Sequence, residues 1–459
     1  MTKITDHLVM AARSVGQAPL PMAAQAMALH CLQDWFAVLL AGQDSDVVKA
    51  VLNNAKSSGG KPQATLLGNG DRLDCISAAM INGTASHILD LDDAHLGSRV
   101  HPSAPLWPAI LAICEWRGLS GEQALRAFVV GVQFQTGLAD LIGESHYQRG
   151  WHSTGTLGSF GATLACANLI GFDHESTCHA IGLTATRAGG LRSVFGSMAK
   201  PLQVGQAAAN GVWAVELVER GVRSVRNVLD GDIGFLALYG DNIEQPAWDL
   251  SATSLSVESI TFKYHAACYG TQAPIEAALK IITNFDVQLA DITRVDVEVE
   301  EQYLSVCNVA QPTTVEQAKF SIRHMVAMAL SGLSTTDSDS FSAAVRDAPE
   351  INALRAKIKV AGSQTRQRAT AKVTVLTVSG DELAAEVDSS QPEQDIKQRA
   401  NKIDQKTRAL LSGYRCPIDT ETLIAACRDF ATAENVSTWI GRLYAEERQH
   451  QKVPTIKDL

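Results

Sequence analysis

Residues 294–299 read Arg-Val-Asp-Val-Glu-Val and alternate strictly between polar and apolar side chains, which indicates that the protein is not all-helical. Such alternation predicts a half-buried β-strand. Residues 372–378, Lys-Val-Thr-Val-Leu-Thr-Val, are rich in β-branched side chains and predict a second strand. A turn at Ser379-Gly380-Asp381 leads into residues 383–387, which predicts a β-hairpin. The sequence therefore predicts a sheet within the C-terminal half.

The residues before this region predict helices instead. Apolar residues recur there at spacings of three and four, and glycine or proline marks the ends of the segments. The predicted helices are Pro21–Gly42, Ala109–Arg117, Gly121–Gly143, Thr156–Gly171 and Lys200–Gly221. Two more are expected between the strands, at 318–331 and 350–360, and residues 391–433 return to a helix-forming composition.

We therefore predict a mainly α protein with two domains. A large all-helical domain is expected from residues 1–270 and 405–459. A smaller α+β domain, residues 271–404, is expected to be inserted into it as a lid. A length of 459 residues favours two cores over one.

The composition restricts the class of function. A net charge of −10 argues against nucleic acid or an anionic membrane as the main partner. No apolar run reaches the roughly 18 residues that a bilayer span needs, and residues 1–17 lack the apolar core of a signal peptide. The 9 cysteines include no Cys-x-x-Cys pair, which predicts reduced thiols and a cytoplasmic location.

Two loops place a histidine just before a predicted helix. One runs from Asp90-Leu91-Asp92-Asp93-Ala94-His95 to His101-Pro102-Ser103, and the other is Gly150-Trp151-His152-Ser153-Thr154-Gly155. The residue before a proline is held extended. The free N–H groups at a helix start favour anions. Together the loops predict a site for proton transfer on a small carboxylate.

The acidic run in the first loop has three readings. Asp90, Asp92 and Asp93 could hold Mg²⁺, as in the aspartate-rich motif of terpenoid synthases. That motif includes a further acidic residue and is followed by a second metal-binding motif, and neither is present in this sequence. The run could also cap a helix and face solvent, or one carboxylate could orient a histidine.

Four further residues are candidates. Lys200 begins a predicted helix, where the dipole does not favour a cation, and Lys263 lies next to the predicted domain junction. Cys268 and His324 are weaker candidates for substrate contact. The sequence has no His-Glu-x-x-His, P-loop, Gly-x-Ser-x-Gly or zinc spacing, so no metal or cofactor is expected.

Taken in order, these stretches resemble the MmgE/PrpD family over most of the chain. The family includes 2-methylcitrate dehydratase, cis-aconitate decarboxylase and iminodisuccinate epimerase. The stretches that carry the resemblance are Asn82–His87, Asp90–Asp93, His101–Ser103, Gly150–Gly161, Gly196–Pro201, Lys263–Thr271 and Ala318–Ser321.

The resemblance implies a homodimer with a cofactor-free site between a helical domain and its lid. The family's site positions carry over to Asp90, His101, His152, Lys200 and Lys263.

Three positions depart from the family pattern. Ala94 replaces a frequent hydroxyl residue, Cys268 stands where the decarboxylase has histidine, and His324 stands where several relatives have tyrosine. These departures weaken the decarboxylase reading and leave the substrate open.

The chemistry implied by the resemblance is removal of a proton from a carbon beside a carboxylate. Lys200 and Lys263 would hold substrate carboxylates, with Cys268 and His324 also at the substrate. His101 and His152 would serve as base and acid, in an order that the sequence leaves open, and Asp90 would orient a histidine or assist protonation.

The leading hypothesis is a hydro-lyase that dehydrates a small hydroxy-di- or tricarboxylate resembling 2-methylcitrate. The alternatives are an epimerase of a dicarboxylate such as iminodisuccinate, a decarboxylase of the cis-aconitate type, and a relative that binds carboxylates without catalysis.

Overall fold

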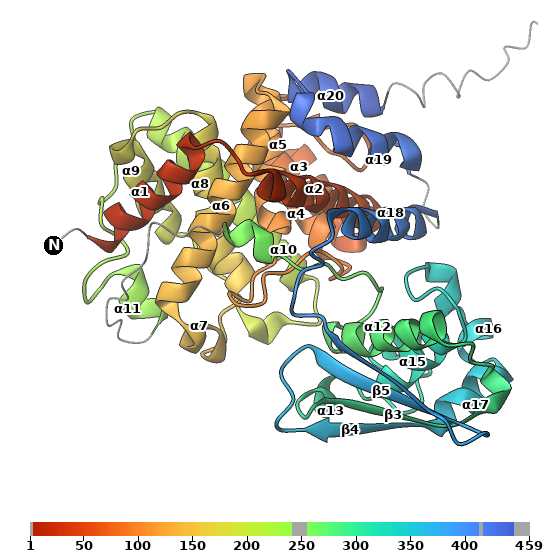
Figure 1. The fold of residues 1–459 in the computed structure, drawn as a ribbon. Helices are drawn as coiled ribbons and strands as arrows, with labels where there is room; N and C mark the ends of the chain where they lie inside the picture. The colour runs from red at the N-terminus through yellow and green to blue at the C-terminus, as the bar shows by residue number, and fades with distance from the viewer. Residues whose placement is uncertain (1–2, 241–254, 413–415, 445–459) are drawn as a thin grey trace, which may run out of the picture. The chain divides into compact units, whose positions relative to one another are not determined.

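The computed structural model describes residues 3–240, 255–412 and 416–444 (Figure 1). Contacts between Cα atoms divide the chain into two compact units, one of Met1–Ile260 with Arg415–Leu459 and the other of Thr261–Tyr414. These boundaries lie ten residues outside the predicted ones on each side. Residues 261–270 and 405–414 belong to the second unit. In that unit Lys402 pairs with Glu276 at 3.2 Å.

The first unit is helical apart from one short strand pair. Its helices are α1 (Ile4–Gln17), α2 (Met22–Gly42), α3 (Asp46–Ser58), α4 (Cys75–His87), α5 (Ser103–Arg117), α6 (Gly121–Ile142), α7 (Glu144–Gln148), α8 (Ser153–Leu169), α9 (His174–Ala185), α10 (Ala199–Glu219), α11 (Phe235–Tyr239), α19 (Thr420–Asp429) and α20 (Val436–Leu443). The strands β1 (Ala64–Thr65) and β2 (Arg72–Leu73) form an antiparallel pair.

Helices α5 and α8 are buried on all sides along most of their length, as expected for helices that are apolar all round. Helix α10 packs against both α4 and α8. The contact with α4 is close, because a Cβ added to Gly205 would lie 2.2 Å from the Met80 carbonyl oxygen and from the Thr84 hydroxyl. This contact fixes the C-terminal end of α4 against the N-terminal half of α10.

The second unit is a four-stranded sheet with helices. Its elements are α12 (Tyr269–Asn284), β3 (Ile292–Glu300), α13 (Tyr303–Val306), α14 (Val315–Lys319), α15 (Ile322–Leu330), α16 (Ala343–Arg346), α17 (Pro349–Lys357), β4 (Ile358–Ser363), β5 (Thr370–Thr377), β6 (Glu382–Asp388) and α18 (Ile396–Ser412). The strand order is β4-β3-β5-β6, with β3 and β4 parallel and the other pairs antiparallel. Helices α12 and α15 lie against one face of this sheet (Figure 1).

The mainly α fold class is confirmed, and so are the predicted strand at 294–299 and the hairpin of β5 and β6. In β3 the alternate residues Val295, Val297 and Val299 are buried.

The helix expected at 350–360 is wrong at its end. Helix α17 stops at Lys357, and residues 358–363 form the edge strand β4. The helix expected at 318–331 is interrupted at Phe320, because the Ser321 side chain caps a new helix, α15.

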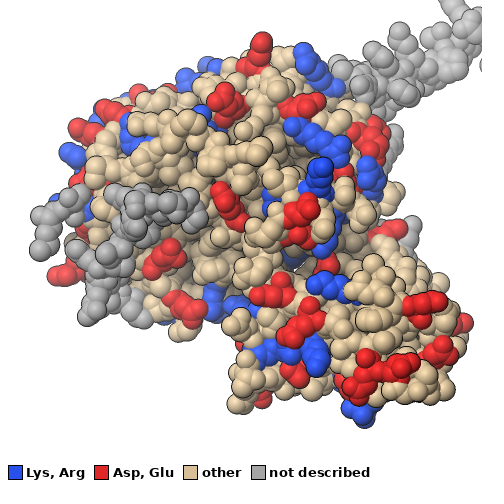
Figure 2. All heavy atoms as spheres, in the orientation of Figure 1, with Lys and Arg blue, Asp and Glu red and all other residues tan. Residues whose placement is uncertain are grey.

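The charged residues on the face in view do not gather by sign. Figure 2 shows acidic and basic side chains interspersed over this face. Among the described residues, no helix is both long enough and apolar enough to cross a bilayer.

Candidate active site

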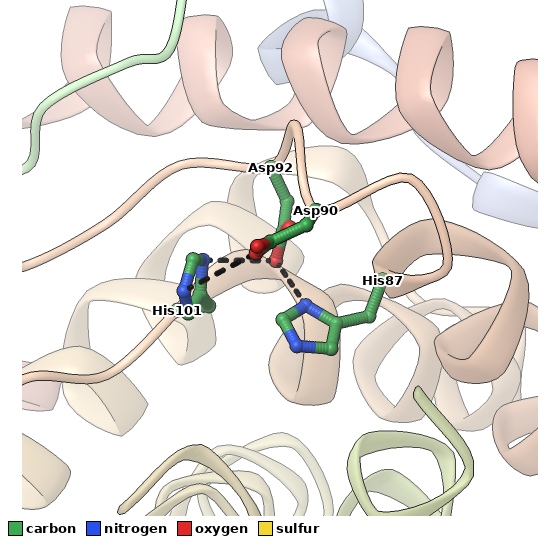
Figure 3. A group of neighbouring side chains, drawn as sticks. All are labelled: His87, Asp90, Asp92 and His101. Carbon is green, nitrogen blue, oxygen red and sulfur yellow. Dashed lines mark hydrogen bonds and ion pairs between the residues drawn. The ribbon is translucent and has the colours of Figure 1, made fainter. Parts of the chain in front are cut away.

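The end of α4 and the loop that follows it hold a buried carboxylate between two imidazoles (Figure 3). The Oδ2 atom of Asp92 lies 2.8 Å from Nδ1 of His87 and 3.3 Å from Nδ1 of His101. The side chains of His87 and Asp92 are fully buried. Burial alone would raise the pKa of Asp92, but the two histidines hold it well below its usual value. Asp92 is therefore an anion that orients both rings.

Asp90 lies two residues earlier and makes different contacts. Its Oδ1 atom is 3.0 Å from Nζ of Lys200 and 3.9 Å from Nε2 of His101. Its φ of 54° is left-handed, a conformation that aspartate tolerates better than most residues. This turn separates the two carboxylates, so that Asp92 points into the core and Asp90 stays half exposed. His101 consequently has a carboxylate near each ring nitrogen.

His152 completes the cluster from another element. It is the N-cap residue of α8, and its backbone N–H donates to the Gly190 carbonyl at 3.0 Å. Its Nδ1 lies 2.8 Å from Oε1 of Gln203, one turn along α10 from Lys200. Because an amide oxygen only accepts, Nδ1 carries the proton and Nε2 has the lone pair. The ring stacks on His87 with 5.9 Å between centroids.

The two histidines flanking His87 have opposite electrostatic surroundings. Burial first, and then the neighbouring charges of His87 and Lys200, lower the pKa of His152 to about 3. This ring is therefore neutral near pH 7. His101 instead lies between two carboxylates, with Asp92 near one ring nitrogen and Asp90 near the other.

The loop between the two candidate residues is tied to the start of α5. The backbone N–H and the hydroxyl of Ser103 both donate to Asp93, which caps the helix directly after His101-Pro102. Burial, and then the charge of Asp34, raises the pKa of Asp93 to about 7. The backbone N–H of His101 donates to the Thr154 hydroxyl at 3.2 Å, which links the two histidine loops. Thr154 thus anchors the backbone of His101, and Asp93 caps the helix that follows it.

The cluster also has the ligand types of a metal site. Ligand atoms of His87, Asp90, Asp92 and His101 all lie within 4.8 Å of one another. The Lys200 ammonium at Asp90, however, already places a cation against this set. The geometry therefore suits proton transfer among these side chains at least as well as metal binding.

The remaining predicted residues lie in the second unit. Lys263 is buried, and Cys268 is the N-cap residue of α12, with its N–H donating to the Lys319 carbonyl. His324 is fully buried in α15, where Nη1 of Arg355 lies 3.3 Å from its Nδ1. Burial, and then Arg355, lowers the pKa of His324 to about 4.

Asp90, His101, His152 and Lys200 were predicted from the sequence as site residues, and in the structure these four side chains belong to one cluster. His87 and Gln203 were not among the predicted residues. The signal for His87 was its place at the end of a helix, five residues before Asp92. The signal for Gln203 was its spacing of three residues from Lys200 on the same helix face.

Comparison with known proteins gives a consistent assignment over most of the chain. Residues 7–246 match the MmgE/PrpD N-terminal domain, and residues 265–428 match the MmgE/PrpD C-terminal domain. A cis-aconitate decarboxylase-like protein of Aspergillus oryzae, oryM, is 30% identical over 301 residues, which cover 60% of this chain and 61% of that protein.

Two further relatives are cis-aconitate decarboxylases. The human protein is 25% identical over 334 residues, covering 70% of this chain and 68% of its own length. The protein of Aspergillus terreus is 29% identical over 231 residues, covering 47% of each chain. The matches to the two Aspergillus proteins thus span less than two thirds of their length.

Proposed function

The chain belongs to the MmgE/PrpD family, and we propose that it is a lyase that removes a proton from a carbon beside a carboxylate of a small di- or tricarboxylate. The leading reaction is dehydration of a hydroxy acid resembling 2-methylcitrate. The observation that carries this proposal is the pairing of a neutral His152 with a His101 that lies between two carboxylates.

The roles follow from which nitrogen carries a proton. Nε2 of His152 has a lone pair, because Nδ1 donates to Gln203, so His152 is assigned as the base. His101 is assigned as the acid, because the carboxylates of Asp92 and Asp90 lie near its two ring nitrogens. Lys200 is the fixed positive charge for the substrate carboxylate and for the enediolate that develops from it.

The proposed dehydration balances with these groups alone. His152 takes the proton from the carbon beside the carboxylate, and electron density moves into the carboxylate held by Lys200. The C–O bond then breaks, and the proton of the His101 imidazolium joins the leaving hydroxyl to form water. Burial is the main cause of the low pKa of His152, and a bound carboxylate would oppose only the smaller contribution of neighbouring positive charge.

Decarboxylation is the second candidate, because the matched relatives carry that name. In that reaction the C–C bond breaks, CO₂ leaves, and the resulting carbanion takes a proton from His101. No base is needed. His152 is therefore essential for dehydration and for epimerisation, but not for decarboxylation.

The test is incubation in D₂O with 2-methylcitrate, citrate, cis-aconitate and iminodisuccinate, followed by proton NMR. Conversion of a hydroxy acid to an unsaturated acid with the same number of carbons identifies dehydration, exchange of the carbon-bound proton without loss of substrate identifies epimerisation, and a product one carbon shorter identifies decarboxylation. The variant His152→Gln should abolish the first two and spare much of the third. Absence of every signal with all four compounds would refute the proposed function.

A further inference from the structure

A second cluster of metal-ligand atoms lies between α1 and α9, on residues that the proposed reaction does not use. His174 and Cys178 are four residues apart on α9 and so share one face of that helix. Asp6 reaches them from α1. The Oδ1 atom of Asp6 lies 2.8 Å from Nε2 of His174 and 3.8 Å from Sγ of Cys178, and Sγ and Nε2 are 3.6 Å apart.

The two distances to Sγ, 3.8 Å and 3.6 Å, are close to edges of a tetrahedral zinc site, whereas the Oδ1–Nε2 distance of 2.8 Å is shorter than such an edge. With bond lengths of about 2.0 Å to oxygen, 2.05 Å to nitrogen and 2.3 Å to sulfur, a tetrahedral ion requires edges of about 3.3, 3.5 and 3.55 Å. The observed triangle has a circumradius of about 2.0 Å. An ion lying slightly above its plane would therefore be within bonding distance of all three atoms without backbone movement.

We propose that Asp6, His174 and Cys178 bind a divalent ion of the zinc class, with water in the fourth position. Thiolate, imidazole and carboxylate are the three ligand types that bind zinc in proteins, whereas magnesium and calcium bind oxygen ligands rather than sulfur. On binding, the Cys178 thiol loses its proton to solvent, and the neutral His174 offers Nε2. The bound ion would join α1 to α9.

The surroundings support an ion that enters from solvent. The side chains of His174 and Asp6 are 31% and 28% exposed, whereas Cys178 is buried beneath them. Asp6 and a Cys178 thiolate together balance two positive charges. Without an ion, Nη2 of Arg226 lies 3.6 Å from Oδ1 of Asp6 and partly neutralises it. Half of the Arg226 side chain is exposed, so it can swing into solvent when an ion arrives.

The test is a titration of the chelator-treated, reduced full-length protein with Co²⁺, followed by absorption spectroscopy. A thiolate bound to Co²⁺ gives a charge-transfer band in the near ultraviolet, and the band should saturate at one ion per chain and be bleached by Zn²⁺. The cluster at His87, Asp90, Asp92 and His101 contains no thiol and cannot give this band.

Four variants make the assignment specific. Cys178→Ser should remove the band, and Asp6→Asn should weaken Co²⁺ binding at least tenfold. Arg226→Gln should instead strengthen it several-fold, because a competing cation is removed. Cys427→Ser is the matched control and should keep the band. Cys427 also lies buried in a helix, and burial alone raises the pKa of its thiol. No band in the wild-type protein, or a band that survives Cys178→Ser in a folded variant, would overturn the proposal.

Discussion

Replacement of Asp92 by asparagine tests the central electrostatic claim about the site. The asparagine keeps the size of the side chain but removes the anion that lies 3.3 Å from Nδ1 of His101. At an effective dielectric constant of about 20, two unit charges at this distance attract by about 5 kcal/mol. That is the largest possible loss of stabilisation for a protonated His101, and it equals a factor of between about 10³ and 10⁴ in rate.

The expected loss in kcat/KM is about 10²- to 10³-fold, because the asparagine dipole and the nearby Asp90 retain part of the attraction. The side chain of Asp92 is fully buried, so we expect the loss to fall on kcat rather than on KM. The separate measurement of kcat and KM therefore gives a second readout beside the overall loss.

Asp93→Asn is the matched control for this variant. Asp93 is an equally buried neighbour, but its carboxylate accepts from Ser103 rather than from a histidine. Its replacement should change kcat less than tenfold. Turnover would be measured with whichever acid of the D₂O panel reacts, alongside circular dichroism for folding. An Asp92→Asn enzyme within threefold of wild type, or an equal loss in both variants, would refute the reasoning.

The other predictions concern the binding groups, the pH dependence of stability and the packing of α10. Lys200→Met and His152→Gln should each lower the dehydration rate at least 10³-fold with little change in melting temperature, and retention of activity in both would place the site elsewhere. Burial lowers the pKa of His95 to about 4, so between about pH 6.5 and pH 4 the unfolded chain binds a proton that the folded chain does not bind. The free energy of unfolding is therefore at its full value above about pH 6.5 and falls towards pH 4 by about 1.4 kcal/mol per pH unit. His95→Gln should reduce this slope, measured by urea titrations at pH 7 and 5. Gly205→Ala should cost about 1–3 kcal/mol of unfolding free energy and reduce turnover, whereas Gly441→Ala, with no atom within 4 Å of the new methyl group, should be neutral or slightly stabilising in the same thermal melts.

Local patterns predicted the elements that are defined by their own residues. Helix α5 ends at Arg117 because Gly118 adopts a left-handed φ of 69°, and the hairpin of β5 and β6 turns at Gly380 with a φ of 92°. Strand β4 was missed because it exists only through parallel pairing with β3, more than 50 residues earlier in the chain. Its sequence, Ile-Lys-Val-Ala-Gly-Ser, has no strict alternation to reveal it.

The site was predictable in its position but not in its internal geometry. Proline after His101 and hydroxyl residues after His152 indicated where both rings would lie. Nothing in the spacing of Asp90 and Asp92 indicated which carboxylate would be buried, because that depends on the backbone turn at Asp90. His87 was overlooked because its contact with Asp92 arises only when the chain reverses after α4.

The charge balance of the cluster limits what it can bind. Asp90 and Asp92 supply two carboxylates, and the Lys200 ammonium lies 3.0 Å from Oδ1 of Asp90. One substrate carboxylate can compete with Asp90 for Lys200, since the aspartate is half exposed and can turn to solvent. The second and third carboxylates of a di- or tricarboxylate find no further cation among the described residues of this cluster. A lyase for such acids therefore needs at least one more positive group, and Lys263 is the residue that the sequence predicts for that role.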